Sequence, residues 1–100
     1  MKLTFKLAEE AESDLVKVWF DVFSISKSAE LADKFIDEFY PAFQKLSNHP
    51  FIGESRDDLY DGLRKWTHKK YLIYYTIHFE FIRIERIIWG KQNQSAVFSH

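Results

Sequence analysis

The chain has 100 residues, a hydrophobic share of 46%, an aromatic share of 18% and no cysteine. The apolar share excludes a disordered chain, because a single domain can bury enough of this surface to offset the entropy lost on folding. The absence of cysteine excludes disulfides and thiolate zinc sites. The net charge is −1, but residues 1–53 carry six basic and nine acidic side chains, whereas residues 62–91 carry seven basic and two acidic ones. The basic second half suggests an acidic partner surface or a nucleic-acid backbone, and ordinary solvated cations are the alternative.

The two features that would direct the chain to or through a membrane are weak. Leu3, Thr4 and Phe5 lie between two lysines and form a run too short for a signal-peptide core. The longest apolar run, residues 71–77, is about seven residues long, against the roughly 20 that a membrane helix needs. We therefore expect a soluble protein of the cytoplasm, without a membrane-spanning segment.

The N-terminal half predicts one strand and one amphipathic helix. Residues 2–7 alternate apolar and polar side chains, which is the period of a half-buried strand. From residue 8 to about 24 the period becomes helical, with Leu15, Val18, Trp19 and Val22 at positions i, i+3, i+4 and i+7. Acidic residues fill the first turns of this segment, where the helix dipole favours them.

Ser28 is a plausible N-cap for a second helix, whose apolar stripe runs to Leu46. Pro41 interrupts this stripe, because its ring clashes with the carbonyl of Asp37 and its nitrogen carries no proton. We expect a kink there, or a new helical turn that starts at Pro41. The two helices share phenylalanine-rich stripes and a short link, so they should pair as an antiparallel hairpin. Six residues are predicted for the core: Trp19, Val22, Phe35, Phe39, Ile73 and Ile84.

The C-terminal half predicts a long loop and three strands. Residues 48–62 hold both candidate turn sites, His49-Pro50 and Gly53, and have no sustained period, and Leu59 and Tyr60 are candidates to pin this loop to the body. Strand-like runs follow at residues 63–67, 71–78 and 81–90. Their links are short enough only for antiparallel hairpins. The expected architecture is therefore a single α+β domain over residues 1–100, in the order β-α-α-β-β-β.

The last two strands are apolar on both faces, and a helical hairpin covers only one. On the final strand, strict alternation places Ile82, Ile84 and Ile88 on one face and Phe81, Ile87 and Trp89 on the other. The second face needs a cover, and few residues follow Gly90 to supply it. We therefore expect a protein partner at Tyr74, Phe81, Ile87 and Trp89, joined by Arg64 and Lys91, with homodimerisation through this face as the alternative.

The remaining chemical candidate is a basic and aromatic set on the strands. It consists of Arg64, Lys65, Tyr71, Arg86 and Lys91. Such a set can hold an RNA phosphate and stabilise the charge that develops when a ribose 2′-hydroxyl attacks it. Ordinary strand packing with outward-facing cations is the alternative. The four histidines, at 49, 68, 78 and 100, have no metal-ligand spacing, so we expect no metal. The three glycines form no phosphate-cradling loop and no nucleotide fingerprint, so we expect no cofactor.

Several of these segments together resemble a known family. They are Asn48-x-Pro50-x-x-Gly53, Gly62-Leu63-Arg64 and the strand from Tyr71 to Tyr75, behind one strand and two helices. In this order and spacing they resemble the ParE branch of the RelE/ParE toxins of bacterial toxin–antitoxin pairs. The resemblance covers nearly the whole chain. It implies a twisted antiparallel sheet packed on an N-terminal helical hairpin.

The resemblance also implies a function and two partners. RelE-type nucleases place an arginine where this chain has Leu72, another near Gln92, and a tyrosine near Phe98. Phenylalanine cannot act as an acid or a base. The nuclease alternative therefore has only the set Lys65, Arg86, Lys91 and His100. The resemblance instead implies a non-catalytic toxin that poisons DNA gyrase and is neutralised by a small antitoxin encoded beside it, with which it forms a hetero-oligomer. Any DNA contact would then come through the antitoxin. The alternatives are a RelE-like, ribosome-dependent mRNA endonuclease and an inactive relative that is kept for antitoxin binding.

Overall fold

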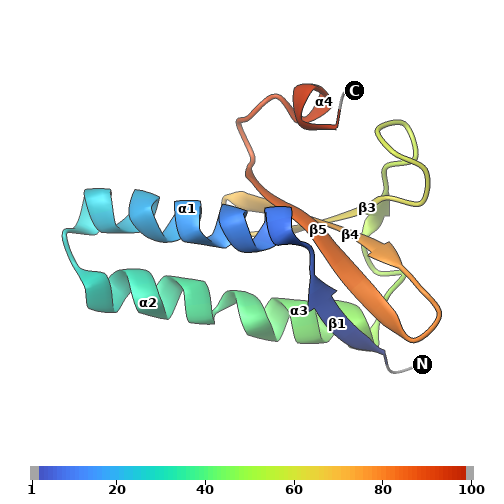
Figure 1. The fold of residues 1–100 in the computed structure, drawn as a ribbon, viewed down its shortest axis with the longest axis horizontal. Helices are drawn as coiled ribbons and strands as arrows, with labels where there is room; N and C mark the ends of the chain where they lie inside the picture. Colours follow the sequence, from blue (N-terminus) through green and yellow to red (C-terminus); the bar gives the residue numbers. More distant parts are fainter. Residues whose placement is uncertain (1–2, 99–100) are drawn as a thin grey trace.

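The computed structural model describes residues 3–98. The chain runs β1 (Thr4–Leu7), α1 (Glu9–Ser26), α2 (Ala29–Asp37), α3 (Phe39–Asn48), β2 (Glu54–Ser55), β3 (Arg64–His68), β4 (Tyr71–Ile77), β5 (Phe81–Trp89) and α4 (Gln94–Val97). The strands form one sheet in the order β1-β5-β4-β3-β2. The helices α2 and α3 lie on one side of it and α4 on the other (Figure 1). The predicted α+β class is confirmed, while β2 and α4 were not predicted.

The sheet is mixed, which corrects the expectation of an antiparallel sheet. β3, β4 and β5 are antiparallel neighbours as predicted, but β1 pairs with β5 in parallel, from Thr4 opposite Phe81 to Leu7 opposite Ile84. The chain continues along the same edge after β1 ends. The Ala8 amide donates to the Ile84 carbonyl at 2.9 Å, and the Ile87 amide donates to the Asp14 carboxylate of α1 at 2.8 Å. If β1 ran antiparallel to β5, its C-terminal end would lie at the start of β5, and α1 could not continue along the later part of that strand.

The helical hairpin has the predicted link and the predicted break. α1 is capped at its C-terminal end by Lys27, which adopts φ 58°. The Ser28 hydroxyl accepts a hydrogen bond from the Leu31 amide at 3.1 Å, so Ser28 is the N-cap of α2. The second helical segment breaks at Glu38, three residues before Pro41. Pro41 therefore lies in the first turn of α3, where an amide proton has no intrahelical partner.

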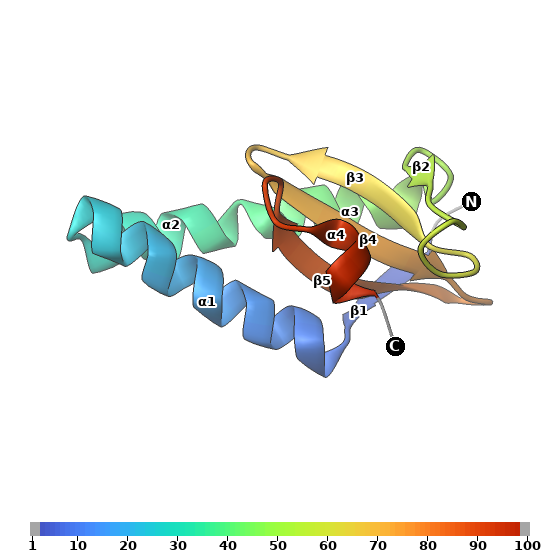
Figure 2. The same cartoon turned by 90° about the horizontal axis from the view of Figure 1, so that it is seen from above.

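The main core lies between the helices and one face of the sheet. Of the six predicted core residues, Phe39, Ile73 and Ile84 are fully buried. Val22 and Phe35 are half-buried and pack against the cluster. Trp19 is also half-buried, at its edge. For Trp19 and Val22 of α1 the reason is the distal half of the hairpin, which extends past the sheet in Figure 2, whereas the Phe35 ring still packs on Tyr71 of β4.

A bulge overturns the predicted faces of β5. Tyr74 is opposite Arg86 and Tyr75 is opposite Ile84, so Glu85 is the extra residue. After the extra residue the alternation is inverted. Ile87 therefore joins Ile82 and Ile84 in the main core, and Ile88 points to the other face, the reverse of the expected assignment.

The second face of the sheet is covered by the chain itself. Leu63, Leu72, Tyr74 and Ile88 form a buried cluster, against which Leu59, Val97 and Phe98 pack. The rings of Tyr74 and Phe98 meet edge to face, with centroids 4.8 Å apart. The Tyr74 hydroxyl donates a hydrogen bond to the Gln94 side chain, which also accepts one from Arg56. The few residues after β5 thus suffice as a cover, contrary to the prediction.

The long loop before β3 is held by Tyr75. Its hydroxyl donates to the Pro50 carbonyl at 2.7 Å and accepts from the Gly53 amide at 2.9 Å. A side chain at position 53 would begin 2.5 Å from this hydroxyl, which is why glycine stands there. Burial raises the pKa of Tyr75. Leu59 contributes to the second cluster as expected, but Tyr60 remains 49% exposed.

Candidate functional site

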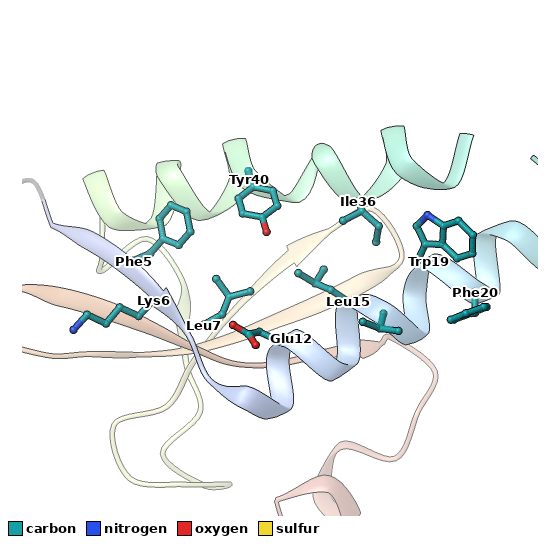
Figure 3. A pocket seen from close by; sticks show the side chains of 10 residues that line it. Phe5, Lys6, Leu7, Glu12, Leu15, Trp19, Phe20, Ile36 and Tyr40 are labelled. Carbon is teal, nitrogen blue, oxygen red and sulfur yellow. The ribbon is translucent and has the colours of Figure 1, made fainter. Parts of the chain in front are cut away.

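An apolar groove of about 480 Å³ lies between the helical hairpin and β1 (Figure 3). α1 forms one wall, and Ile36 of α2 and Tyr40 of α3 form the other. β1 forms its base near the sheet. The residues from β1 are Phe5, Lys6 and Leu7, and those from α1 are Glu12, Leu15, Val16, Trp19 and Phe20. Val16 and Phe20 are 57% and 60% exposed, so the groove offers large apolar side chains to a partner.

The aromatic walls of the groove are fixed in place. The Trp19 indole donates to the Asp33 carboxylate of α2 at 2.7 Å, which ties the two helices together. The Trp19 ring stacks on Phe23 with centroids 5.3 Å apart. On the other wall, Tyr40 packs edge to face on Phe43 at 5.5 Å. A partner would therefore meet a pre-formed surface, which reduces the entropy lost on binding.

The backbone edge of β1 borders the same groove. Within residues 3–98, β1 pairs only with β5. The Thr4 amide donates to the Glu80 carbonyl, just before β5, and the Ala8 amide donates to the Ile84 carbonyl of β5. Because the hydrogen-bonding groups of successive strand residues point to opposite edges, those of Phe5 and Leu7 point away from β5. The groove thus combines apolar walls with a strand edge that can accept an added strand.

Sequence reasoning missed this groove, although a signal was present. Val16, Phe20 and Phe23 form a second apolar series at i, i+4 and i+7, beside the series that was assigned to the core. Two adjacent series make an apolar stripe wider than one sheet face covers. The number of apolar positions on α1 therefore indicated a second contact, but not where it lies.

The predicted basic set is not gathered into one site. The Arg86 guanidinium makes two hydrogen bonds to Asp14, at 2.8 and 3.0 Å. This hydrogen bonding raises the pKa of Arg86. Arg64 donates to the carbonyls of residues 53 and 51, and Lys65 pairs with Glu54 of β2 at 3.4 Å. Each of these cations thus has its own partner on a different element.

The remaining members of that set lie elsewhere. Tyr71 packs edge to face on Phe35 and Phe39 in the main core. Lys91 lies beyond β5, with its ammonium 5.8 Å from the centre of the Trp89 ring. His100 lies outside the described residues. The proposed nuclease residues therefore do not converge on one phosphate position.

The predicted partner face is also corrected. Tyr74 is fully buried beneath the C-terminal tail, and Ile87 is buried in the main core, so neither is available to a partner. Phe81 is half-buried and stacks on His78. Trp89 is 48% exposed. Of the four apolar residues proposed for this contact, Trp89 remains the most accessible.

The described residues hold neither a metal-ion cluster nor a membrane-spanning helix. Within residues 3–98, no group of three or more histidine, aspartate or glutamate side chains is placed to hold a metal ion. No helix of the described part is both long and apolar enough to cross a membrane.

Three comparisons place the chain among known proteins. A family model described as "ParE toxin of type II toxin-antitoxin system, parDE" matches residues 5–94. The chain is 31% identical over 83 residues to Toxin ParE3 of Caulobacter vibrioides, which covers 83% of this chain and 82% of that protein. It is also similar to a chain of the solved chromosomal ParDE system from P. aeruginosa. That similarity has a TM-score of 0.74 and 20% identity, and it covers 89% of this chain and 97% of the other.

Proposed function

The chain belongs to the ParE toxin family of type II toxin–antitoxin systems, and from this premise we propose that it poisons DNA gyrase by binding and is neutralised by a small antitoxin encoded beside it. Its place of action is then the cytoplasm, where gyrase works on DNA. The observation that carries this proposal is the contrast between the open apolar groove and the cations of the strands, most of which already have partners.

The surroundings of these cations support binding over catalysis. In-line cleavage of RNA needs cations that converge on a phosphate and a group that moves a proton. Arg86 is held by Asp14, and Lys65 pairs with Glu54. Phe98, at the position where a nuclease of the superfamily would carry a tyrosine, packs on Tyr74. A binding mechanism requires none of these groups to be free.

We assign the contact with gyrase to the end of β5. Trp89 is half-exposed, and the Lys91 ammonium lies over its ring, so an aromatic surface and a positive charge are adjacent. Tryptophan is enriched among the central contacts of protein interfaces, and an adjacent positive charge suits an acidic partner surface. This surface lies outside the groove, so a toxin can lose one contact and keep the other.

Purified gyrase tests this assignment. With supercoiled plasmid and ATP, we expect the chain to accumulate cleaved DNA that remains bound to gyrase, and the variants Trp89→Ala and Lys91→Ala to lose most of this effect. Lys34→Ala is the control, because it removes an exposed lysine of α2 rather than one beside the end of β5. Absence of cleaved DNA at all toxin concentrations would refute gyrase as the target.

We assign the antitoxin to the groove. An amphipathic segment of the antitoxin would place apolar side chains between the two helices and pair its backbone with the outer edge of β1. Acidic residues of such a segment would suit Lys6, which lies at the groove with its ammonium 4.4 Å from the Phe81 ring centre. Charge complementarity here adds mainly association rate and specificity.

Two exposed tyrosines provide a matched test of the groove. Tyr40 lines the groove and is 45% exposed, whereas Tyr60 lies in the loop before β3 and is 49% exposed. In calorimetric titrations with the purified antitoxin, we expect Tyr40→Ala to weaken binding by about tenfold or more, as truncation of an aromatic interface residue commonly does. Tyr60→Ala should leave the affinity unchanged. Equal effects of the two substitutions would place the antitoxin elsewhere.

A further inference from the structure

The distal half of α1 carries an apolar stripe for which the chain itself supplies no cover. Val16, Phe20 and Phe23 are 57%, 60% and 37% exposed, and they follow one another at i, i+4 and i+7 along one side of the helix. This part of the hairpin projects past the sheet in both ribbon views (Figures 1 and 2). The outer side of α1 is therefore accessible to another helix along this stripe.

The charges beside the stripe form a self-complementary pair. Lys17 and Asp21 are exposed and lie one turn apart, along the same side of the stripe. Neither takes part in an ion pair among the described residues. A basic and an acidic side chain at this spacing are what an antiparallel copy of the same helix would need opposite them.

A two-fold axis that is perpendicular to α1 and lies at the level of Trp19 accounts for both the exposed stripe and the charge pair. It relates two antiparallel α1 helices and brings the same flank of each copy together. Lys17 then faces Asp21 of the second copy, and the reverse contact follows by symmetry. Val16 falls between Phe20 and Phe23 of the second copy. On the opposite flank Glu12 faces Ser26, so this register brings no like charges into contact.

From this charge pattern we propose that the free chain forms a two-fold dimer through Val16, Phe20 and Phe23 of α1, with reciprocal Lys17–Asp21 ion pairs. The small side chains of Ser13 and Ser24 lie at the two ends of the contact and allow the helices to approach closely. The occupant of the stripe is thus a second copy of this chain.

The dimer has a consequence for the antitoxin, and this consequence rests on the function proposed above. Val16 and Phe20 also line the groove that we assign to the antitoxin. A second copy and the antitoxin therefore compete for the same side chains. The antitoxin would convert toxin dimers into complexes in which each toxin chain is separated from the other.

Sedimentation velocity of the isolated chain over a range of concentrations tests the dimer. We expect a monomer–dimer equilibrium. Its association constant should fall about tenfold in Lys17→Asp and in Asp21→Lys, because the two-fold axis makes two copies of the surface ion pair and each substitution removes both. The double variant Lys17→Asp with Asp21→Lys should recover the original dimerisation. Lys34→Asp, which makes the same change of charge on exposed α2, should have little effect.

Three other results overturn the proposed dimer. A chain that is monomeric at every concentration shows that the stripe binds no second copy. A dimer that responds equally to Lys17→Asp and Lys34→Asp, or that the double variant does not recover, uses another surface. Adding the purified antitoxin separates the two proposals: dimers that persist in the antitoxin complex refute the competition alone, and failure of the antitoxin to bind leaves the charge-swap result intact.

Discussion

Asp14 joins two elements, α1 and β5, through one carboxylate. It accepts two hydrogen bonds from Arg86 and one from the Ile87 amide, and thereby ties α1 to the edge of β5. The side chains of Asp14 and Arg86 are only 12% and 28% exposed. Removing the Asp14 carboxylate would leave the charge of Arg86 and the amide of Ile87 without a partner at a position with little access to water. The pair is structural, which explains why Arg86 is not free for chemistry.

Asp14→Ala should therefore lower the free energy of unfolding by about 2–4 kcal/mol. Asp58→Ala is the matched control, because Asp58 also makes two hydrogen bonds to an arginine, Arg56, but is 63% exposed. Its removal should cost about 0–1 kcal/mol, as for other surface ion pairs. Urea unfolding of the two variants compares the costs. Equal losses would mean that burial does not distinguish the pairs.

His68 should make stability depend on pH. Its Nε2 is buried without a hydrogen-bond partner among the described residues, and its ring packs 4.6 Å from that of Phe39. Burial, helped by the charge of Lys69, lowers the pKa of His68 below its ordinary value of about 6.5. The unfolded chain therefore binds this proton more readily. The stability from neutral His68 is complete above about pH 6.5 and is lost as the pH falls through the lowered pKa.

Unfolding free energies measured between neutral and mildly acidic pH test this expectation. The original chain should lose stability below about pH 6.5, and His68→Gln should lose less, since glutamine does not titrate. Thr67→Gln, at the exposed neighbouring position of β3, should keep the original pH dependence. If His68→Gln and the original chain follow the same curve, His68 is not the titrating group.

Among the elements, the second helical segment shows how much a local rule can predict. The clash of Pro41 with the carbonyl four residues earlier indicated a break, and the structure has one at Glu38. The new helix starts two residues before Pro41, so the proline lies in the first turn, where an amide proton has no intrahelical partner. The position of the break was therefore predicted to within one turn.

Pro41→Ala should change the free energy of unfolding by less than about 1 kcal/mol, because no intrahelical hydrogen bond is missing at this position. Lys34→Pro, at an exposed position inside α2, should cost about 3 kcal/mol or more. Thermal unfolding followed by circular dichroism measures both. A large gain of stability in Pro41→Ala would show that the break is strained rather than accommodated.

The strands show what local rules do not predict. Both apolar faces of β4 were evident from alternation, and the structure confirms them. The bulge at Glu85 was not evident, because it depends on how β4 and β5 pair and not on either strand alone. Ile87 and Ile88 consequently exchanged faces, and the proposed partner surface was displaced with them.

On the scale of the whole molecule, the order of helices and strands was predictable but the positions of the open surfaces were not. Periodicity reports which side chains are apolar, and it does not report which element covers them. The tail covers Tyr74 although only a short α4 is available, and the distal part of α1 stays open although its residues suit a core. The groove and the stripe on α1 could be located only once the hairpin was seen to extend past the sheet.

The central claim is that this toxin acts on gyrase by binding, and induction of the chain alone in bacterial cells tests it most directly. We expect the DNA-damage response and filamentation, with intact mRNA, loss of both effects in Trp89→Ala, and full protection by the co-expressed antitoxin. Immediate loss of translation with fragmented mRNA, abolished by Lys65→Ala or Lys91→Ala, would contradict the account and identify these lysines as catalytic.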